Sequence, residues 1–222
     1  MENTLHSYSF AQATKPTLAL DRLLEHYIPA SVPLLLSAGM SFQFSPDKES
    51  GGIILFHEGI GSLCHSENGL HISTIFPPTI VGLSDGYSLF YDVPARPQHY
   101  FYAETDCICN FLPLDAFLEL NEKHDLWHDI ARILAHRLMV MSIREQELVG
   151  VDSYLKVRSL LLEIWIYPEK YRKKINVVSF VIRRTGLSRS RVLAILSELR
   201  KGGYIEIAVG KLTKLSKLPL GY

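Results

Sequence analysis

Two arginines, Arg189 and Arg191, stand at the start of a helical repeat near the end of the chain. Behind them apolar residues recur at helical spacing, at Val192, Ile195, Leu196 and Leu199. The opposite face of this helix carries one lysine and three small side chains, Ser190, Ala194, Ser197 and Lys201. A small outer face permits close approach to a groove, and arginines at a helix N-terminus reach base edges or phosphates. The residue types therefore favour recognition of a nucleic acid.

Positive charge is concentrated in the same region, although the formal net charge of the chain is zero. From Asn176 onward nine basic residues are opposed only by Glu198 and Glu206, so this segment carries +7 and residues 1–175 carry −7. An acidic body with a basic tail indicates a polyanionic partner for the tail. The alternative is an ordinary amphipathic helix with a solvated basic face, which has the same periodicity. The excess positive charge of this segment and the elements that flank the helix argue against that alternative.

The elements around this helix complete a recognisable unit. Upstream, the segment VVSFVIRRTG predicts a shorter helix that ends at Gly186, and downstream Gly202-Gly203 precede two short strands, 204–208 and 212–215. Helix, glycine turn, second helix and two-stranded wing together predict a winged helix-turn-helix. The expected DNA contacts are Ser188, Arg189, Ser190 and Arg191 at the groove, with Arg183, Arg184, Lys201, Lys211 and Lys214 at phosphates.

The preceding residues must position this unit. Residues 17–27 predict an amphipathic helix, and residues 33–114 contain many short β-rich runs separated by proline and glycine, GYSLFYDV (86–93) among them. Asn68-Gly69 between two runs indicates a two-residue hairpin. So many short strands predict a β-sandwich or β-roll.

A long helix is expected over residues 125–149, with two apolar stripes. One stripe would cover the β domain and the other the same helix of a second copy; burial within a single chain is the alternative. The expected dimerisation residues are Ile130, Leu134, Leu138, Met141 and Leu148. Asp152 is a plausible N-cap for the next helix, which divides the chain into residues 1–124 (β-roll with an N-terminal helix), 125–150 (dimerisation helix) and 151–222 (winged helix-turn-helix).

Other classes of site are poorly supported. His124 and His128 have zinc-binding spacing but lack a third ligand nearby. Cys64 and His71 are expected on one face of the hairpin, with a metal or redox role the minor alternative to a structural one, and Cys107 and Cys109 are expected as core thiols. No nucleophile elbow, P-loop, signal peptide or run of ~18 apolar residues is present. We therefore expect a cytoplasmic protein that is not an enzyme and needs no catalytic residues, metal or cofactor.

The order of these parts resembles the CRP/FNR superfamily of bacterial transcription factors over nearly the whole chain. The segment ILAHRLMVMSIREQELVGVDSYLKVRSLLLEIW is similar to the family's dimerisation helix, hinge and following helix, and SRSRVLAILSELRKGGYI to its recognition helix. The segment RKGGYIEIAVGKLTKLSKLP is closer still to the enterobacterial IprA/YaiV-type group, named for hydrogen-peroxide resistance. The resemblance implies an α+β fold with a cyclic-nucleotide-binding-like β-roll (jelly roll), a long dimerisation helix and a C-terminal winged helix-turn-helix.

Several family positions differ in this chain. Ser190 stands where cyclic-AMP-dependent members have a base-contacting Glu, and Ala194 where they have an Arg, so the operator should differ. In this chain Leu83 stands at the position of the ribose-binding Glu of those members. Pro97-Gln98 stand at the position of their phosphate-binding Arg-Ser pair, and Arg96 is one residue away. Met141 replaces a nucleotide-contacting Thr, although Ser142 is kept. No cysteine precedes Cys64 to ligate an FNR-type cluster.

The leading hypothesis is thus a homodimeric regulator that binds double-stranded DNA independently of cyclic AMP, with a link to oxidative stress. RNA polymerase is a further expected partner, and a small-molecule effector is unidentified or absent. The alternative is a ligand- or metal-binding sensor that acts through protein partners and carries a vestigial helix-turn-helix.

Overall fold

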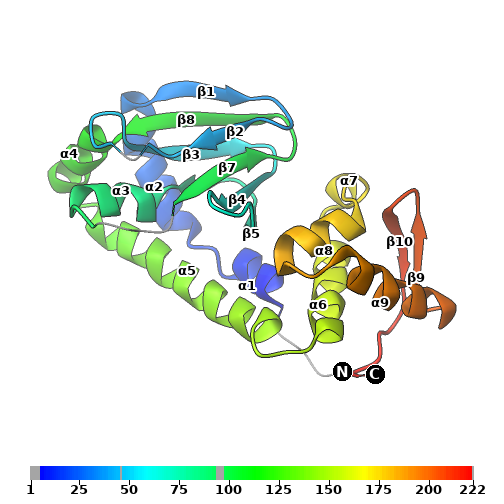
Figure 1. Ribbon diagram of the computed structural model, residues 1–222. Coiled ribbons are helices and arrows are strands. Elements are labelled where there is room, and N and C mark those ends of the chain that lie inside the picture. The colour runs from blue at the N-terminus through cyan, green and yellow to red at the C-terminus, as the bar shows by residue number, and fades with distance from the viewer. Residues whose placement is uncertain (1–5, 46, 94–97, 222) are drawn as a thin grey trace. The chain divides into compact units, whose positions relative to one another are not determined.

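The computed structural model describes residues 6–45, 47–93 and 98–221 (Figure 1). The chain forms two compact units. Residues 16–135 make up the first unit. Residues 6–15 pack together with residues 136–221 in the second unit, whereas the sequence had grouped residues 1–124 with the β-roll; the predicted helix 17–27 lies in the first unit.

The first unit contains two four-stranded antiparallel sheets. One has the strand order β1-β8-β3-β6, formed by Val32–Leu36, Cys107–Pro113, Gly52–Glu58 and Thr79–Val81. The other has the order β2-β7-β4-β5, formed by Ser41–Gln43, His99–Ala103, Gly61–His65 and His71–Ile75. The sheets face each other across an aromatic core, where the rings of Phe56 and Phe101 lie 5.2 Å apart between centroids. This arrangement confirms the predicted β-roll.

Helices cover the outer side of β3. They are α2 (Thr17–Tyr27) with the short 3₁₀ helix Ile28–Ala30, α3 (Leu83–Phe90) and α4 (Leu114–His124). Their apolar faces bury Leu20, Leu23, Leu83 and Phe117 against Ile53 and Leu55. The predicted helix 17–27 is therefore confirmed, because its apolar spacing corresponds to a face that the sheet buries.

Two sequence expectations in this unit are wrong. Residues 86–93 were expected as a strand because the aromatic residues of this run suggested β structure. Most of them lie in α3 instead, because Leu83 and Leu89 bury one helical face in the core. The connection around Asn68-Gly69 joins β4 to β5 as a hairpin, but it spans residues 66–70 and is not a two-residue turn. Leu70 N–H donates to the Asn68 side chain, and Gly69 adopts φ +66°.

The long helix α5 (Trp127–Leu148) continues from the first unit into the second. Ile130 and Ile133 are fully buried in the core beneath β3, together with Leu126. The expected dimer contact of Ile130 is therefore wrong, because the first apolar stripe of α5 is already covered by its own β domain.

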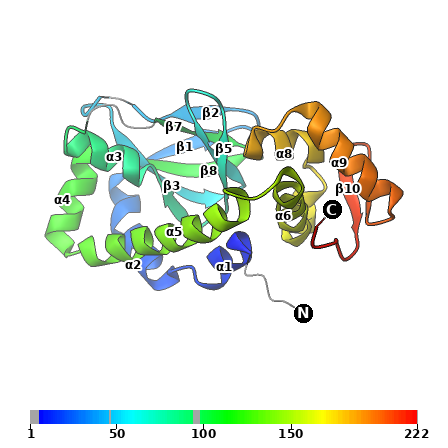
Figure 2. The same ribbon diagram turned by 60° about the horizontal axis from the view of Figure 1, so that its bottom comes forward.

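The second unit contains the remaining helices and the two-stranded wing (Figures 1 and 2). Its elements are α1 (Ser7–Ala13), α6 (Ser153–Ile166), α7 (Glu169–Arg172), α8 (Val177–Thr185), α9 (Arg189–Lys201), β9 (Ile205–Ala208) and β10 (Lys211–Leu215). Asp152 caps α6 by accepting a hydrogen bond from Leu155 N–H, as predicted. Val209 and Gly210, both with positive φ, form the turn between the strands of the wing.

Candidate nucleic-acid interface

The turn between α8 and α9 has the geometry that the sequence predicted. Gly186 ends α8 with φ +68°, a left-handed conformation that strains other L-residues. Ser188 is the N-cap of α9, and its hydroxyl accepts a hydrogen bond from Arg191 N–H at 3.3 Å. Ser188 therefore fixes the start of α9 two residues after Gly186, and the first helical turn of α9 lies at the surface.

One face of α9 is buried and the opposite face is exposed, as predicted. Val192, Ile195, Leu196 and Leu199 are buried, at most 7% exposed. Arg189, Ser190 and Arg191 are exposed at the N-terminal end, and Ala194 and Ser197 continue the exposed face. The unsatisfied N–H groups and the helix dipole add partial positive charge at this end. The result is an exposed, positively charged helix end on a surface of small side chains, suited to binding a phosphate-rich groove.

The predicted phosphate contacts on α9 and the wing are at the surface but already have partners. Lys201 pairs with Glu198 at 2.8 Å, and this hydrogen bond and charge raise the pKa of Lys201. Lys214 pairs with Glu206 at 2.9 Å. Exposed pairs of this kind contribute little to stability, so either lysine can exchange its carboxylate for a phosphate at low cost. Arg183 is half-buried on α8.

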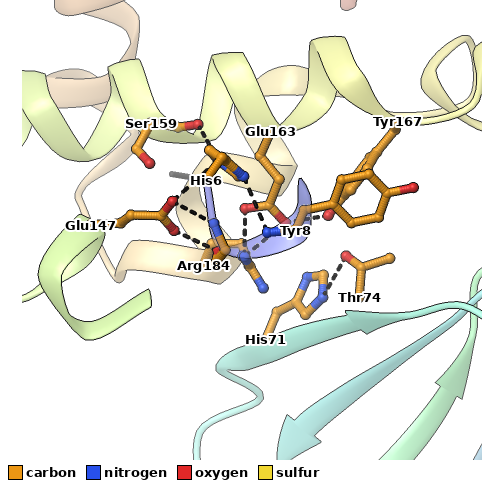
Figure 3. A network of polar contacts seen from close by, with 10 residues as sticks. His6, Tyr8, His71, Thr74, Glu147, Ser159, Glu163, Tyr167 and Arg184 are labelled. Atoms are coloured by element: carbon orange, nitrogen blue, oxygen red, sulfur yellow. Dashed lines mark hydrogen bonds and ion pairs between the residues drawn. The ribbon is translucent and has the colours of Figure 1, made fainter. Parts of the chain in front are cut away.

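Arg184 does not lie at the surface, and the phosphate contact predicted for it is wrong. The side chain is 5% exposed, and its Nη2 donates to both carboxylate oxygens of Glu163, at 2.8 and 2.6 Å (Figure 3). Tyr167 donates its hydroxyl to the same carboxylate. The sequence did contain a signal for this, because residue 184 continues the buried stripe of α8 formed by Val177, Phe180 and Val181.

The structure adds basic residues that the sequence patterns did not single out. They lie in and just after α7, at Lys170, Arg172, Lys173 and Lys174. The side chain of Lys211 donates to the Lys174 carbonyl, and Val177 N–H donates to the Gly210 carbonyl at 2.9 Å, so this segment lies beside the tip of the wing. Arg172 stacks over Trp165 and Lys173 pairs with Glu169. Lys170 and Lys174 are exposed, and Lys174 lies beside the wing. The basic run EKYRKK is the sequence signal by which these residues could have been found.

Part of the second stripe of α5 is exposed. Leu138, Met139 and Met141 expose 67%, 50% and 58% of their surface. Leu134 packs partly against the core of the first unit, and Leu148 is half-buried. Leu138 and Met141 are three residues apart and share one exposed face of α5, whereas Met139 is outside this stripe. Large apolar side chains on one exposed helix face are characteristic of an interaction surface.

The three cysteines are enclosed in the β-roll. Cys64, Cys107 and Cys109 are at most 2% exposed. Burial raises the pKa of Cys107, and burial together with Cys107 raises the pKa of Cys109 to about 12. The thiolate is the reactive form of cysteine, so these two thiols are poorly reactive in the folded protein. Cys64 lies directly opposite His71 in the β4–β5 register.

Among the residues described, no group of three or more His, Cys, Asp or Glu side chains is arranged to hold a metal ion. His124 stacks on His26, with ring centroids 4.2 Å apart. No helix in the described ranges is both long and apolar enough to cross a membrane.

The β-roll differs from a cyclic-nucleotide site at a position the structure describes. Gly82 adopts φ +92° directly before α3, and Leu83 is 1% exposed in the core. A buried leucine thus occupies the position where the resemblance places a ribose-binding glutamate. Gln98 is exposed, whereas Arg96 and Pro97 lie outside the described residues.

Comparisons with known proteins agree with this architecture. A family model described as winged helix-turn-helix DNA binding matches residues 153–220. The chain resembles the c-di-GMP responsive global regulator CLP of Xanthomonas campestris (TM-score 0.71, 13% identity, 89% of this chain and 100% of that chain). It also resembles a CRP/FNR-family transcriptional regulator of Thermus thermophilus (TM-score 0.60, 19% identity, 83% and 93%). These likenesses confirm the predicted fold.

Two curated relatives are more similar in sequence. The inhibitor of hydrogen peroxide resistance of Escherichia coli K12 is 35% identical over 179 residues, which covers 81% of this chain and 84% of the relative. The Salmonella typhimurium protein of the same name is 32% identical over 178 residues, covering 80% and 83%. The chain therefore belongs to the family of the inhibitor of hydrogen peroxide resistance, with a CRP/FNR-type fold and a C-terminal winged helix-turn-helix DNA-binding domain.

Proposed function

We propose that this protein is a transcription regulator that binds double-stranded DNA as a homodimer in the cytoplasm. The observation that carries the proposal is the exposed N-terminal end of α9, where Arg189 and Arg191 project from a surface of small side chains. In this mechanism the end of α9 enters a major groove, and the two arginines contact base edges or nearby phosphates. Ser188 acts as the cap that positions this end.

The phosphate contacts come from two adjacent segments. Two lysines of the wing, Lys211 and Lys214, and two lysines in or just after α7, Lys170 and Lys174, hold the backbone of the duplex next to the groove that α9 reads. Each lysine that neutralises a phosphate releases counterions, which makes binding depend on salt. These contacts position the protein and carry no sequence information directly.

Dimerisation would use the exposed part of the second stripe of α5. Leu138 and Met141, with Leu134 and Leu148 at its margins, supply the apolar seam. Two copies related by a two-fold axis then present two α9 helices to successive major grooves on one side of a duplex. RNA polymerase is the expected partner of the DNA-bound dimer.

The regulator would work without cyclic AMP, because Leu83 fills the core where a ribose-binding carboxylate is needed. The names of the curated relatives support a link to hydrogen-peroxide resistance. The buried thiols Cys107 and Cys109 do not favour direct oxidation as the signal.

The test is DNA binding measured by fluorescence anisotropy, on a duplex selected in vitro with the wild-type protein and on random duplex. Replacing Arg189 or Arg191 with Ala should cost ~1–3 kcal/mol on the selected site and far less on random DNA. Arg200→Ala is the matched control, since Arg200 is exposed at the opposite end of the same helix.

Lysine variants should behave differently. Replacing Lys211, Lys214, Lys170 or Lys174 with Ala should weaken both duplexes alike and lower the slope of log affinity against log salt by about 0.9 for each lost contact. A wild-type protein that binds no duplex at low salt contradicts the proposal. So does a result in which the arginine and lysine variants show the same ratio of specific to random affinity.

A further inference from the structure

The N-terminal helix α1 lies antiparallel to the last three turns of α5. At one end, Ser7 donates twice to the Glu147 carboxylate, from its backbone N–H at 2.9 Å and from its hydroxyl at 2.6 Å. At the other end, Thr14 and His136 are hydrogen-bonded at 3.1 Å. Ser7 is only 4% exposed, so water competes poorly for this carboxylate. Figure 2 shows α1 beside this part of α5.

The same helix also contacts α6. A ring nitrogen of His6 lies 3.3 Å from the Ser159 carbonyl oxygen, and the ring of Tyr8 packs edge-on against Tyr167 at 4.7 Å between centroids. Tyr167 in turn donates to Glu163, which holds Arg184 of α8 (Figure 3). A continuous chain of contacts thus leads from Glu147 through α1 and α6 to the helix that precedes α9.

These contacts lie on both sides of the link between α5 and α6. The link consists of residues 149–152, and Gly150 in it has φ +72°, with no atom within 4 Å of the point that a Cβ would occupy. Val149 is exposed. A short glycine-containing link with so little packing does not by itself hold two helices at a fixed angle. The neighbouring helix α1 supplies hydrogen bonds to one side of the link and side-chain contacts to the other.

We propose that α1 is a brace that sets the orientation of the DNA-binding helices relative to the end of α5, with Ser7 and Glu147 as its positioning residues. This inference rests on the proposed DNA binding by a dimer. In such a dimer the two α9 helices must be separated by about one turn of DNA, ~34 Å. An angle that varies at the 149–152 link changes that separation, so a loosened brace should impair binding to two half-sites together without altering how one domain binds one half-site.

The experiment compares full-length Ser7→Ala and Glu147→Gln with two matched controls, Ser9→Ala and Glu145→Gln. Ser9 and Glu145 are exposed neighbours on the same two helices. Affinities are measured on three duplexes: the complete operator, a single half-site, and operators with one base pair added or removed between the half-sites. Far-UV circular dichroism establishes that each variant is folded.

The brace predicts a specific pattern. Ser7→Ala and Glu147→Gln should bind the half-site within about twofold of wild type but the complete operator about tenfold more weakly, and they should discriminate less against altered spacing. Ser7→Ala removes the hydroxyl donor and keeps the backbone N–H, and Glu147→Gln removes the charge of the acceptor. Both variants weaken the same contact, so their effects should be less than additive in the combined variant. Should Glu147→Gln fail to fold, Ser7→Ala alone carries the comparison.

Other patterns overturn the inference in distinguishable ways. If both variants keep the wild-type preference for the complete operator, or lose affinity for operator and half-site in parallel, α1 does not orient the domain. If the wild type binds no duplex, or gains nothing from the second half-site, the proposed DNA binding or dimerisation is wrong and the brace fails with it.

Discussion

The buried pair of Glu163 and Arg184 allows a quantitative test of the second unit. The two side chains are 4% and 2% exposed and come from α6 and α8. Glu163→Gln is nearly isosteric and keeps an oxygen that can accept from Tyr167, but it leaves the Arg184 guanidinium buried without its counter-charge. The substitution therefore isolates the charge interaction from packing.

The expected cost is large because neither group can return to water. Removing one partner of a buried ion pair typically destabilises a protein by about 3–5 kcal/mol. In a unit of about this size each kcal/mol corresponds to a fall of at least ~4 °C in the melting temperature, so Glu163→Gln should lower it by roughly 12 °C or more. Replacing both residues, as Glu163→Gln with Arg184→Met, should cost less than the sum of the two single variants, because no uncompensated charge remains.

The assay is urea unfolding followed by far-UV circular dichroism for wild type, the two single variants and the double variant. Glu198→Gln serves as the matched control, because it breaks the exposed pair with Lys201 and should change the free energy of unfolding by no more than ~1 kcal/mol. A cost below ~1 kcal/mol for Glu163→Gln, or strict additivity in the double variant, would refute the assigned role of Arg184.

The same pair predicts how stability depends on pH. Burial alone would raise the pKa of Glu163, but the Arg184 charge and the Tyr167 hydroxyl outweigh it and hold this pKa below its ordinary value. A carboxyl whose pKa is depressed on folding contributes stability above its unfolded pKa of ~4.3, and this contribution is lost as the pH falls through the folded-state pKa. The stability gap between wild type and Glu163→Gln should therefore narrow below pH ~4.

Three further predictions address the dimer, the thiols and the effector. Light scattering should find the wild-type protein at about twice the chain mass of 25.2 kDa. The variants Leu138→Glu and Met141→Glu should be monomeric, because either change places a charge in an apolar interface. A wild-type monomer at micromolar concentration contradicts the dimer. Because the pKa of Cys109 is about 12, a disulfide reagent at pH 8 should label Cys107 and Cys109 slowly in the folded protein and rapidly in urea, and fast labelling of the native state would show that these thiols are accessible. Millimolar cyclic AMP should leave the melting temperature unchanged. A ligand that binds at a concentration 100 times its dissociation constant would add about 2.7 kcal/mol to the free energy of unfolding, so a rise of several degrees would show that Leu83 does not block the nucleotide.

The local features of the second unit were predictable from the sequence. The apolar spacing of α9, its serine cap, the glycine turn and the wing depend on residues within a few positions of one another, and the structure reproduces each of them. The β-roll could be predicted as a class from the number of short strands. Repeated spacing and capping residues predict local structure because the hydrogen bonds and buried faces that they reflect are themselves local.

The tertiary structure decided which predicted contacts are available. Arg184 was assigned to phosphate by its type and neighbours, but its partner Glu163 lies 21 residues earlier on another helix. Ile130 was assigned to the dimer, but the helices and sheet around it assemble from segments across the whole first unit. The contact of Ser7 with Glu147 joins residues 140 positions apart. Helical periodicity indicates that residue 184 lies on the buried face of α8, but it does not identify the partner residue, because such pairings form only when packing of the buried faces brings distant segments together.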